Sequence, residues 1–136
     1  LFRSVEIDLS QCPDLAPALA VAAAYADGET ALTHAGRLRL KESDRLAALS
    51  TVLTQMGAEV EEGPETLTIQ GKPALDGGVT IEPFGDHRIA MAASIAALGA
   101  KAPVTIQNAQ CVGKSYPQFF HHMKLLGGVC HVVNHR

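Results

Sequence analysis

The clearest pattern in the chain is a series of apolar side chains at helical spacing. They stand 0, 3, 6, 7 and 10 residues from the first: Leu46, Leu49, Val52, Leu53 and Met56. This is the period of an amphipathic α-helix. The pattern therefore predicts a helix that opens with residues 40–46 and stops at Gly57.

Shorter segments have the alternating or clustered apolar residues of β-strands. We predict strands at 5–9, 30–34, 58–62, 66–70, 79–82, 104–107 and 129–133. The break at Gly63-Pro64 is typical of a hairpin between two of these strands. The sequence thus predicts a mixed chain, with strands and helices following one another.

Three further helices are predicted from their capping residues and glycine stops. They cover 15–26, 88–98 and the segment that begins at 119. The residues expected to cap them are Asp14, Asp86 and a capping box at 115–118.

The elements occur in the same order twice. Asp14 and Asp86 are 72 residues apart, and Lys41 and Lys114 are 73 apart. We therefore expect two repeat units of about 70 residues, at 4–72 and 77–134, within a single partial domain 1–136. The predicted class is α/β (α+β), with helices packed against sheets.

Composition narrows the possible partners. The chain has 136 residues, 47% of them hydrophobic, and a net charge of −3, which suits one folded domain. A negative chain does not attract nucleic acid or an anionic membrane through its overall field. We expect neither as a partner, and any anion site must be local.

Cysteine spacing and the apolar run indicate the compartment. The three cysteines follow no zinc-ligand spacing and are expected to be reduced. The apolar run 15–26 is too short to span a bilayer, and acidic residues precede it. We expect a cytoplasmic protein. The adjacent histidines point different ways on a helix, and no Walker or dinucleotide motif occurs, so neither a metal nor a cofactor is expected.

Two cations in the first turn of the 40–46 helix are unusual. A helix N-terminus already carries partial positive charge and favours anions, so Lys41 and Arg45 together describe an anion site. The alternative is a solvated helix end with mixed charge. Arg88 and Lys114 stand at or just before helix starts in the second unit. The shared feature predicts one anion-binding cleft, in which arginines grip carboxylate or phosphate bidentately.

Two acids lie among these cations. Asp14 can be simply an N-cap and Glu42 simply a surface charge. The alternative is that a general base and a general acid stand among the cations, which would suit chemistry on a phosphate-bearing substrate. His87 either stacks in the site or titrates near neutral pH, and Asp86 is expected to act only as a cap. No nucleophile pattern stands out, which disfavours covalent catalysis.

Three segments of the chain resemble the signature segments of the 5-enolpyruvylshikimate-3-phosphate synthase family, in the same order. They are Leu40-Lys41-Glu42-Ser43-Asp44-Arg45-Leu46, Asp86-His87-Arg88-Ile89-Ala90-Met91-Ala92 and Cys111-Val112-Gly113-Lys114-Ser115-Tyr116-Pro117. Pro13-Asp14 resembles a fourth. The resemblance covers the whole chain. Because the family enzyme is much longer and this chain begins without methionine, it implies a C-terminal portion that lacks the N-terminal lobe.

The resemblance also implies a fold and an activity. The family folds as two lobes of repeated βαβαββ units, an inside-out α/β barrel. Its members are transferases that move the enolpyruvyl group of phosphoenolpyruvate to the 5-hydroxyl of shikimate 3-phosphate and release phosphate. This reaction belongs to the shikimate pathway of aromatic amino acid biosynthesis. Without the other lobe, we expect the chain alone to be inactive.

Residue roles follow from motif position. The resemblance implies that Asp14 is the base on the hydroxyl and that Glu42 is the acid for the methylene carbon. The implied substrate ligands are Arg45, Arg88 and Lys114 for phosphoenolpyruvate, Lys41 for shikimate 3-phosphate, and His87 within the site.

One position departs from the family pattern, and two other functions stay open. Arg37 stands where many members carry Asn against the shikimate ring. One alternative is a fragment of UDP-N-acetylglucosamine enolpyruvyl transferase, which shares the fold. The other is a non-catalytic, anion-binding or structural module.

Overall fold

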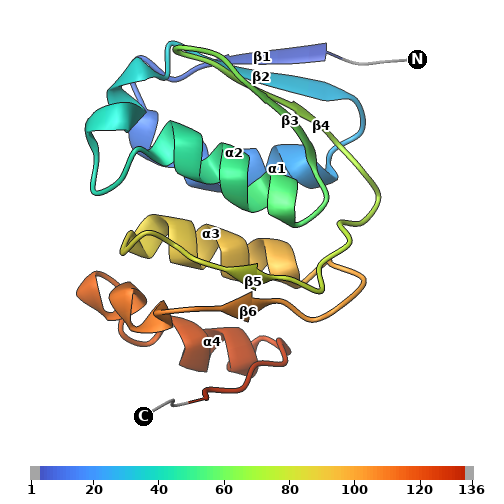
Figure 1. Cartoon of the computed structure of the whole chain (residues 1–136), viewed down its shortest axis with the longest axis vertical. Helices are drawn as coiled ribbons and strands as arrows, with labels where there is room; N and C mark the ends of the chain where they lie inside the picture. The colour runs from blue at the N-terminus through green and yellow to red at the C-terminus, as the bar shows by residue number, and fades with distance from the viewer. Residues whose placement is uncertain (1–3, 134–136) are drawn as a thin grey trace.

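The computed structural model describes residues 4–133 as stacked layers of sheet and helix (Figure 1). The strands are β1 (Ser4–Asp8), β2 (Glu29–Thr33), β3 (Glu59–Glu62), β4 (Leu67–Gln70), β5 (Thr80–Ile81) and β6 (Thr105–Ile106). The helices are α1 (Ala16–Tyr25), α2 (Arg45–Gln55), α3 (His87–Ala97) and α4 (Phe119–Leu125). Three 3-10 helices connect them: η1 (Pro13–Leu15), η2 (Gly36–Leu40) and η3 (Ala109–Lys114).

Two sheets hold the strands. The larger has the order β1-β2-β4-β3, with β1 parallel to β2 and β4 antiparallel to both of its neighbours. The predicted hairpin is confirmed, since β3 pairs with β4 and the Gly63 amide donates to the Thr66 carbonyl at 2.9 Å. The smaller sheet pairs β5 with β6 in parallel.

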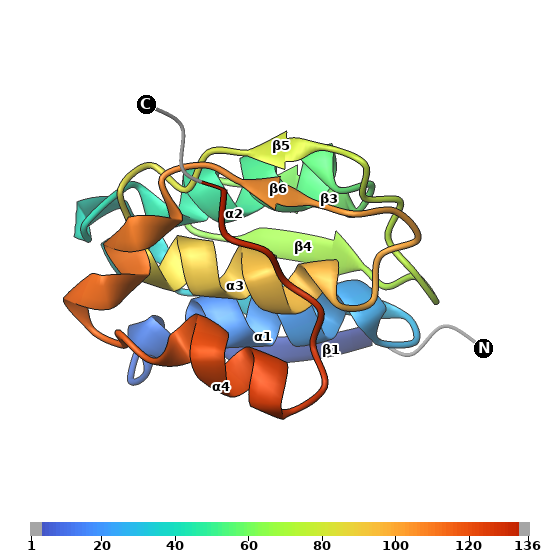
Figure 2. The same cartoon turned by 90° about the horizontal axis from the view of Figure 1, so that it is seen from below.

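The layers follow one another in a fixed order. Figure 1 shows the larger sheet over α1 and α2, then α3, then β5 and β6, and α4 at the far side. Seen from below, α4 and the segment after it cross in front of α1 and α3 (Figure 2). Among the helices within residues 4–133, none is long and apolar enough to cross a membrane.

The core lies between the larger sheet and its helices. Leu32, Leu67 and Ile69 of the sheet and Leu46 and Leu49 of α2 are buried. Alanines dominate the buried face of α1, which lets the backbone approach its neighbours closely. At Gly71 an added Cβ would lie 1.5 Å from the Ala26 carbonyl oxygen, so only glycine fits there. The Tyr25 hydroxyl joins α1 to α3 by donating to the Ala96 carbonyl.

The start of α2 corrects one prediction. Lys41 lies outside the helix in an extended conformation (φ −90°, ψ −161°), and Arg45 is the first helical residue. Asp44 is the N-cap and accepts from the Ala47 amide at 3.0 Å. An aspartate satisfies a free helix amide, so the helix begins after it rather than at residue 40.

Asp14 is not the helix cap that the sequence predicts. It is the second residue of η1, which begins at Pro13, and neither η1 nor α1 has a side-chain cap. Its carboxylate instead faces Lys41 and Arg45. By contrast, Asp86 is confirmed as the cap of α3, because it accepts from the Arg88 amide at 3.0 Å.

Two predictions near the C-terminus are wrong. The capping box fails because Ser115 is the C-cap of η3, and α4 begins later at Phe119 without a side-chain cap. Residues 129–133 form no strand, and Val129, Val132 and Val133 are exposed. A strand needs a neighbour to satisfy its backbone groups, and this segment pairs with none of residues 4–133.

The two halves of the chain begin with the same kinds of element. Each has a strand, a helix, a parallel second strand, a 3-10 helix and another helix. Within residues 4–133, a hairpin, β3–β4, follows only in the first half. The division into repeat units 4–72 and 77–134 stays a prediction, and residue 134 lies outside the described part.

Candidate functional site

The four helices begin at one end of the molecule. Figures 1 and 2 place the starts of α1, α2, α3 and α4 on the same side, together with the three 3-10 helices. This end therefore gathers positive helix dipoles and connecting turns. Most of the predicted site residues lie in these turns or in the first helical residues.

Arg45 is the centre of a charged cluster at this end. Its side chain is only 1% exposed and contacts three carboxylates. Arg45 Nε lies 2.8 Å from Asp86 Oδ2, and Nη2 lies 3.2 Å from Asp86 Oδ1 and 2.6 Å from Glu42 Oε2. Nη1 lies 3.4 Å from Asp14 Oδ1. These acids come from three separate segments, so one guanidinium joins them.

The N–H groups of Arg45 are divided among three carboxylates. A guanidinium has five N–H groups, one on Nε and two on each Nη. Asp86 takes the Nε and one Nη2 group, Glu42 the other Nη2 group and Asp14 one Nη1 group. No hydrogen bond of the second Nη1 N–H is found among the described residues.

Lys41 and Arg88 approach the same cluster through Asp14. Lys41 Nζ lies 3.2 Å from Asp14 Oδ1, the atom that also faces Arg45. Asp14 and Arg88 together line the charged end of a groove of about 230 Å³ between α1 and α3. The rest of this groove is mainly apolar, from Val21, Met91 and other side chains.

The two proposed proton-transfer residues predicted from the sequence, Asp14 and Glu42, are both held as carboxylates. The hydrogen bond from Lys41 lowers the pKa of Asp14, and the charges of Lys41, Arg88 and Arg45 act in the same direction. A hydrogen bond from its own backbone lowers the pKa of Glu42, and the Arg45 charge adds to this effect. The cluster is thus a set of neutralised pairs rather than an open positive cleft.

Asp86 is the most buried member of the cluster. Its side chain has no exposed surface, and besides Arg45 it accepts from Ser43 Oγ at 2.8 Å. Burial raises its pKa, but the hydrogen bonds from Arg45 and Ser43 outweigh that effect and leave the pKa below its ordinary value. Asp86 therefore stays ionised in the interior.

His87 and Lys114 are placed differently from the other predicted residues. His87 follows Asp86, is 7% exposed, and its Nδ1 has no hydrogen-bond partner within residues 4–133. Lys114 ends η3, is exposed, and makes no ion pair with a described carboxylate. The structure thus brings Asp14, Lys41, Glu42, Arg45 and Arg88 together. Within residues 4–133, Lys114 makes no hydrogen bond or ion pair with them.

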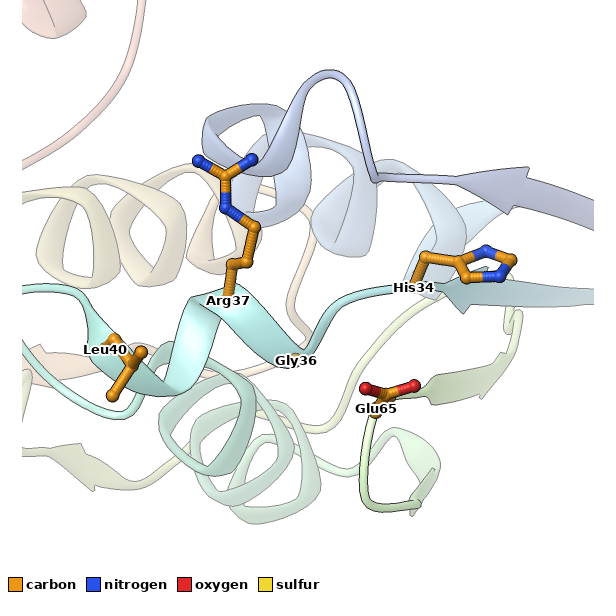
Figure 3. Close-up of a pocket in the computed structure, with 5 residues that line it drawn as sticks. All are labelled: His34, Gly36, Arg37, Leu40 and Glu65. Carbon is orange, nitrogen blue, oxygen red and sulfur yellow. The ribbon is translucent and has the colours of Figure 1, made fainter.

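Arg37 lies beside a second hollow. Figure 3 shows this pocket of about 310 Å³, lined by His34, Gly36, Arg37, Leu40 and Glu65. Its side chains do not converge, since Arg37 points toward the turn between β1 and α1 while His34 and Leu40 point elsewhere. Arg37 has no hydrogen bond or ion pair in the described part of the chain. This hollow therefore lacks the convergent groups of the Arg45 cluster.

Sequence reasoning missed the role of Asp86 and Ser43. Asp86 was expected only to cap α3, and Ser43 carried no prediction. Helix periodicity contains no signal for the contact between them, because 43 residues separate them along the chain. The structure alone shows that Asp86, the cap of α3, also accepts hydrogen bonds from Arg45, the first residue of α2.

A family comparison decides what kind of protein carries this cluster. The family model described as EPSP synthase (3-phosphoshikimate 1-carboxyvinyltransferase) matches residues 2–123. The chain belongs to the EPSP synthase family. The family predicted from the signature segments is thereby confirmed.

Relatives in this family share both sequence and fold with the chain. A 3-phosphoshikimate 1-carboxyvinyltransferase of Clostridium acetobutylicum is 54% identical over 129 residues, covering 95% of this chain and 30% of that protein. One from Clostridioides difficile is 47% identical over 122 residues, covering 90% and 28%. A solved EPSP synthase of Acinetobacter baumannii has a TM-score of 0.83 at 32% identity, covering 93% and 29%. The mixed α/β enolpyruvyl transferase fold is confirmed.

The chain spans only about 30% of the length of these relatives. The Arg45 cluster is therefore one part of what a whole EPSP synthase family member contains.

Proposed function

We propose that this chain supplies part of the active site of a 3-phosphoshikimate 1-carboxyvinyltransferase. The proposed reaction transfers the enolpyruvyl group of phosphoenolpyruvate to the 5-hydroxyl of shikimate 3-phosphate and releases phosphate. The observation that carries the proposal is the convergence of Lys41, Arg45 and Arg88 on Asp14 at the end of the molecule where the helices start. Membership of the EPSP synthase family supports it.

The proposed chemistry needs a base, an acid and a grip on the leaving group. Asp14 takes the hydroxyl proton as the oxygen attacks C2 of phosphoenolpyruvate, and Glu42 gives a proton to C3. The C–O bond to phosphate then breaks, and the phosphate leaves with the electron pair and takes up the proton held by Asp14. The Glu42 carboxylate takes a proton back from C3, so that the enol ether is restored. Arg45, Arg88 and Lys114 hold the phosphate and carboxylate, and Lys41 contacts shikimate 3-phosphate.

The low pKa of Glu42 places a condition on this scheme. A carboxylate paired with Arg45 cannot give a proton, so the pair has to change when the substrate binds. An anionic ligand beside the guanidinium competes for its N–H groups and repels the nearby carboxylate. Both effects raise the pKa of Glu42, which makes it a better acid in the complex than in the free chain.

A binding module without catalysis is the second candidate. It is favoured by the pairing of the cluster's cations, because every acid at the site already has a cationic partner. Phosphoenolpyruvate binding with no turnover in any assembly would support this second function.

A chimera tests the proposed function. The 129-residue match in the Clostridium acetobutylicum relative is replaced by this chain, and phosphate release is measured with both substrates. We expect turnover from the chimera and none from the 136-residue chain alone. An inactive but folded chimera would contradict the proposed function. Turnover by the 136-residue chain alone would contradict the claim that it carries only part of the active site.

The two acids are tested in the same chimera. Glu42→Gln and Asp14→Asn keep side-chain size and remove the proton-transfer groups, so each should lower kcat by about 100- to 10,000-fold. Glu59→Gln is the matched control, because Glu59 lies on β3 with only a 3.8 Å contact to Lys72. Losses no larger than those of the control would remove Asp14 and Glu42 from the mechanism.

A further inference from the structure

We propose that Asp86 is a positioning residue for the Arg45 guanidinium, in addition to capping α3. This inference rests on the proposed function, because Arg45 is there a ligand for phosphoenolpyruvate. The claim is that the buried carboxylate sets which edge of the guanidinium faces the substrate.

The contacts of Asp86 support a fixed orientation. Its two oxygens receive Arg45 Nε and Nη2 at 2.8 and 3.2 Å, which is a bidentate pairing. Such a pairing fixes the plane and the direction of the guanidinium as well as its position. Arg45 is 1% exposed and Asp86 is fully buried, so water does not loosen the pair.

The pairing with Asp86 also leaves hydrogens on Nη1 and Nη2 of Arg45 free to face the other two acids. Because Asp86 takes the Nε hydrogen and one Nη2 hydrogen, one Nη1 hydrogen and the second Nη2 hydrogen are directed to Asp14 and Glu42. These are the proposed base and acid. A substrate anion bound on this side meets the guanidinium without competing with Asp86.

Asp86 joins two parts of the site that are distant in sequence. The same carboxylate accepts from Ser43 Oγ before α2 and from the Arg88 amide in α3. The buried Asp86 carboxylate therefore holds the starts of α2 and α3, which carry Arg45 and Arg88, in a fixed relative position. Capping alone would require only the Arg88 contact. Asp44 also caps a helix and pairs with an arginine, Arg39, but that pair lies at the surface, and the Asp44 side chain makes no ion pair with Arg45.

The experiment compares Asp86→Asn with Asp44→Asn in the active chimera. Asparagine caps helices about as well as aspartate, so both variants keep their helix caps and lose a negative charge. Asp44 is the matched control, because it caps α2 and pairs with Arg39 at the surface. The measurements are the KM values for the two substrates and kcat.

We expect Asp86→Asn to lower kcat/KM for phosphoenolpyruvate by about 100-fold, the size of effect that a misplaced reacting group causes. KM should rise much more for phosphoenolpyruvate than for shikimate 3-phosphate. Asp44→Asn should leave both values within a fewfold range. A merely structural loss lowers the active fraction and leaves both KM values unchanged, so that outcome, or equal effects of both variants, would overturn the proposal.

A second measurement covers failure of Asp86→Asn to fold. In the 136-residue chain, Ser43→Ala removes one hydrogen bond to Asp86 from a partly exposed loop. Exchange of the Arg45 Nε hydrogen with water is followed by NMR. We expect slow exchange in the parent and faster exchange in Ser43→Ala, with Arg39 unchanged. Fast exchange already in the parent would contradict a fixed guanidinium. An inactive parent chimera would instead count against the proposed function alone.

Discussion

Arg45 and Arg39 form two charged clusters that use the same chemistry in opposite surroundings. Arg39 contacts Asp44 at 2.9 Å, Glu62 at 3.0 Å and the carbonyls of Pro64 and Gly63, and it is 31% exposed. Arg45 also contacts several acceptors but is 1% exposed. Buried charges interact strongly and are costly to leave unpaired, whereas surface pairs are screened by water. The difference teaches that burial, rather than the number of contacts, decides what each cluster does.

Each cluster ties together a different part of the fold. The Arg39 cluster holds η2 to the β3–β4 hairpin. Loss of its contacts would leave no buried charge without a partner. The Arg45 cluster joins η1, the loop before α2 and the cap of α3. A change at Arg45 should therefore affect stability and ligand binding together, and a change at Arg39 should affect neither strongly.

Removing Arg45 should have the largest effect. Arg45→Ala leaves the Asp86 carboxylate buried without its main partner, so we expect a loss of about 3–5 kcal/mol in the free energy of unfolding, measured by urea denaturation. The double variant with Asp86→Asn removes the stranded charge and should recover part of the loss. No recovery would mean that lost packing, rather than unpaired charge, causes the destabilisation.

Acid should weaken the buried cluster next. The pKa of Asp86 is lower in the folded chain than its ordinary value of 3.8, so its contribution to stability is present above that value and is lost as pH falls through the folded pKa. Asp8, Asp14 and Glu42 also have lowered pKa values, and their contributions to stability change with pH in the same direction. Asp86→Asn should flatten the fall in stability below pH 3.8. If the stability of Asp86→Asn fell as steeply with pH as that of the parent, Asp86 would not be a source of the acid dependence.

Removing Arg39, the centre of the surface cluster, should destabilise the chain less than removing Arg45. Arg39→Ala should shift the urea midpoint by only a fraction of the Arg45→Ala shift, because its ion pairs are screened by solvent. Added salt should reduce even this difference. If Arg39→Ala destabilised the chain as much as Arg45→Ala, burial would not be what distinguishes the two clusters.

Arg88 should have the smallest effect on folding. Its exposed side chain makes no hydrogen bond or ion pair within residues 4–133, so Arg88→Ala should change stability by no more than about 0.5 kcal/mol. In the chimera the same variant should weaken phosphoenolpyruvate binding far more than shikimate 3-phosphate binding. Equal losses for both ligands would move Arg88 out of its proposed role.

Sequence patterns predict the local elements better than the contacts between them. Leu46, Leu49 and Leu53 are buried on the predicted face of α2, and the hairpin at Gly63-Pro64 forms as expected. These features depend on short-range periodicity and turn chemistry. Residues 129–133 looked equally strand-like, but a strand also needs a partner, which periodicity does not encode.

The site shows the same limit. Motif spacing identified Lys41, Arg45 and Arg88 as cations that belong together, and folding brings all three to Asp14. The pairing of Arg45 with a buried carboxylate could not be predicted, because an N-capping aspartate has the same sequence signature whether exposed or buried. Asp44 is exposed and Asp86 is buried, yet both precede a helix start.

Titration of the 136-residue chain with phosphoenolpyruvate, followed by NMR at the arginine Nε–H groups, tests the central claim most directly. If the Arg45 cluster is part of a phosphoenolpyruvate site, the titration should give saturable shifts at Arg45 and Arg88 and none at Arg39. Absent shifts at Arg45 and Arg88, or equal shifts at Arg39, would contradict the claim that the helix starts gather one specific anion site.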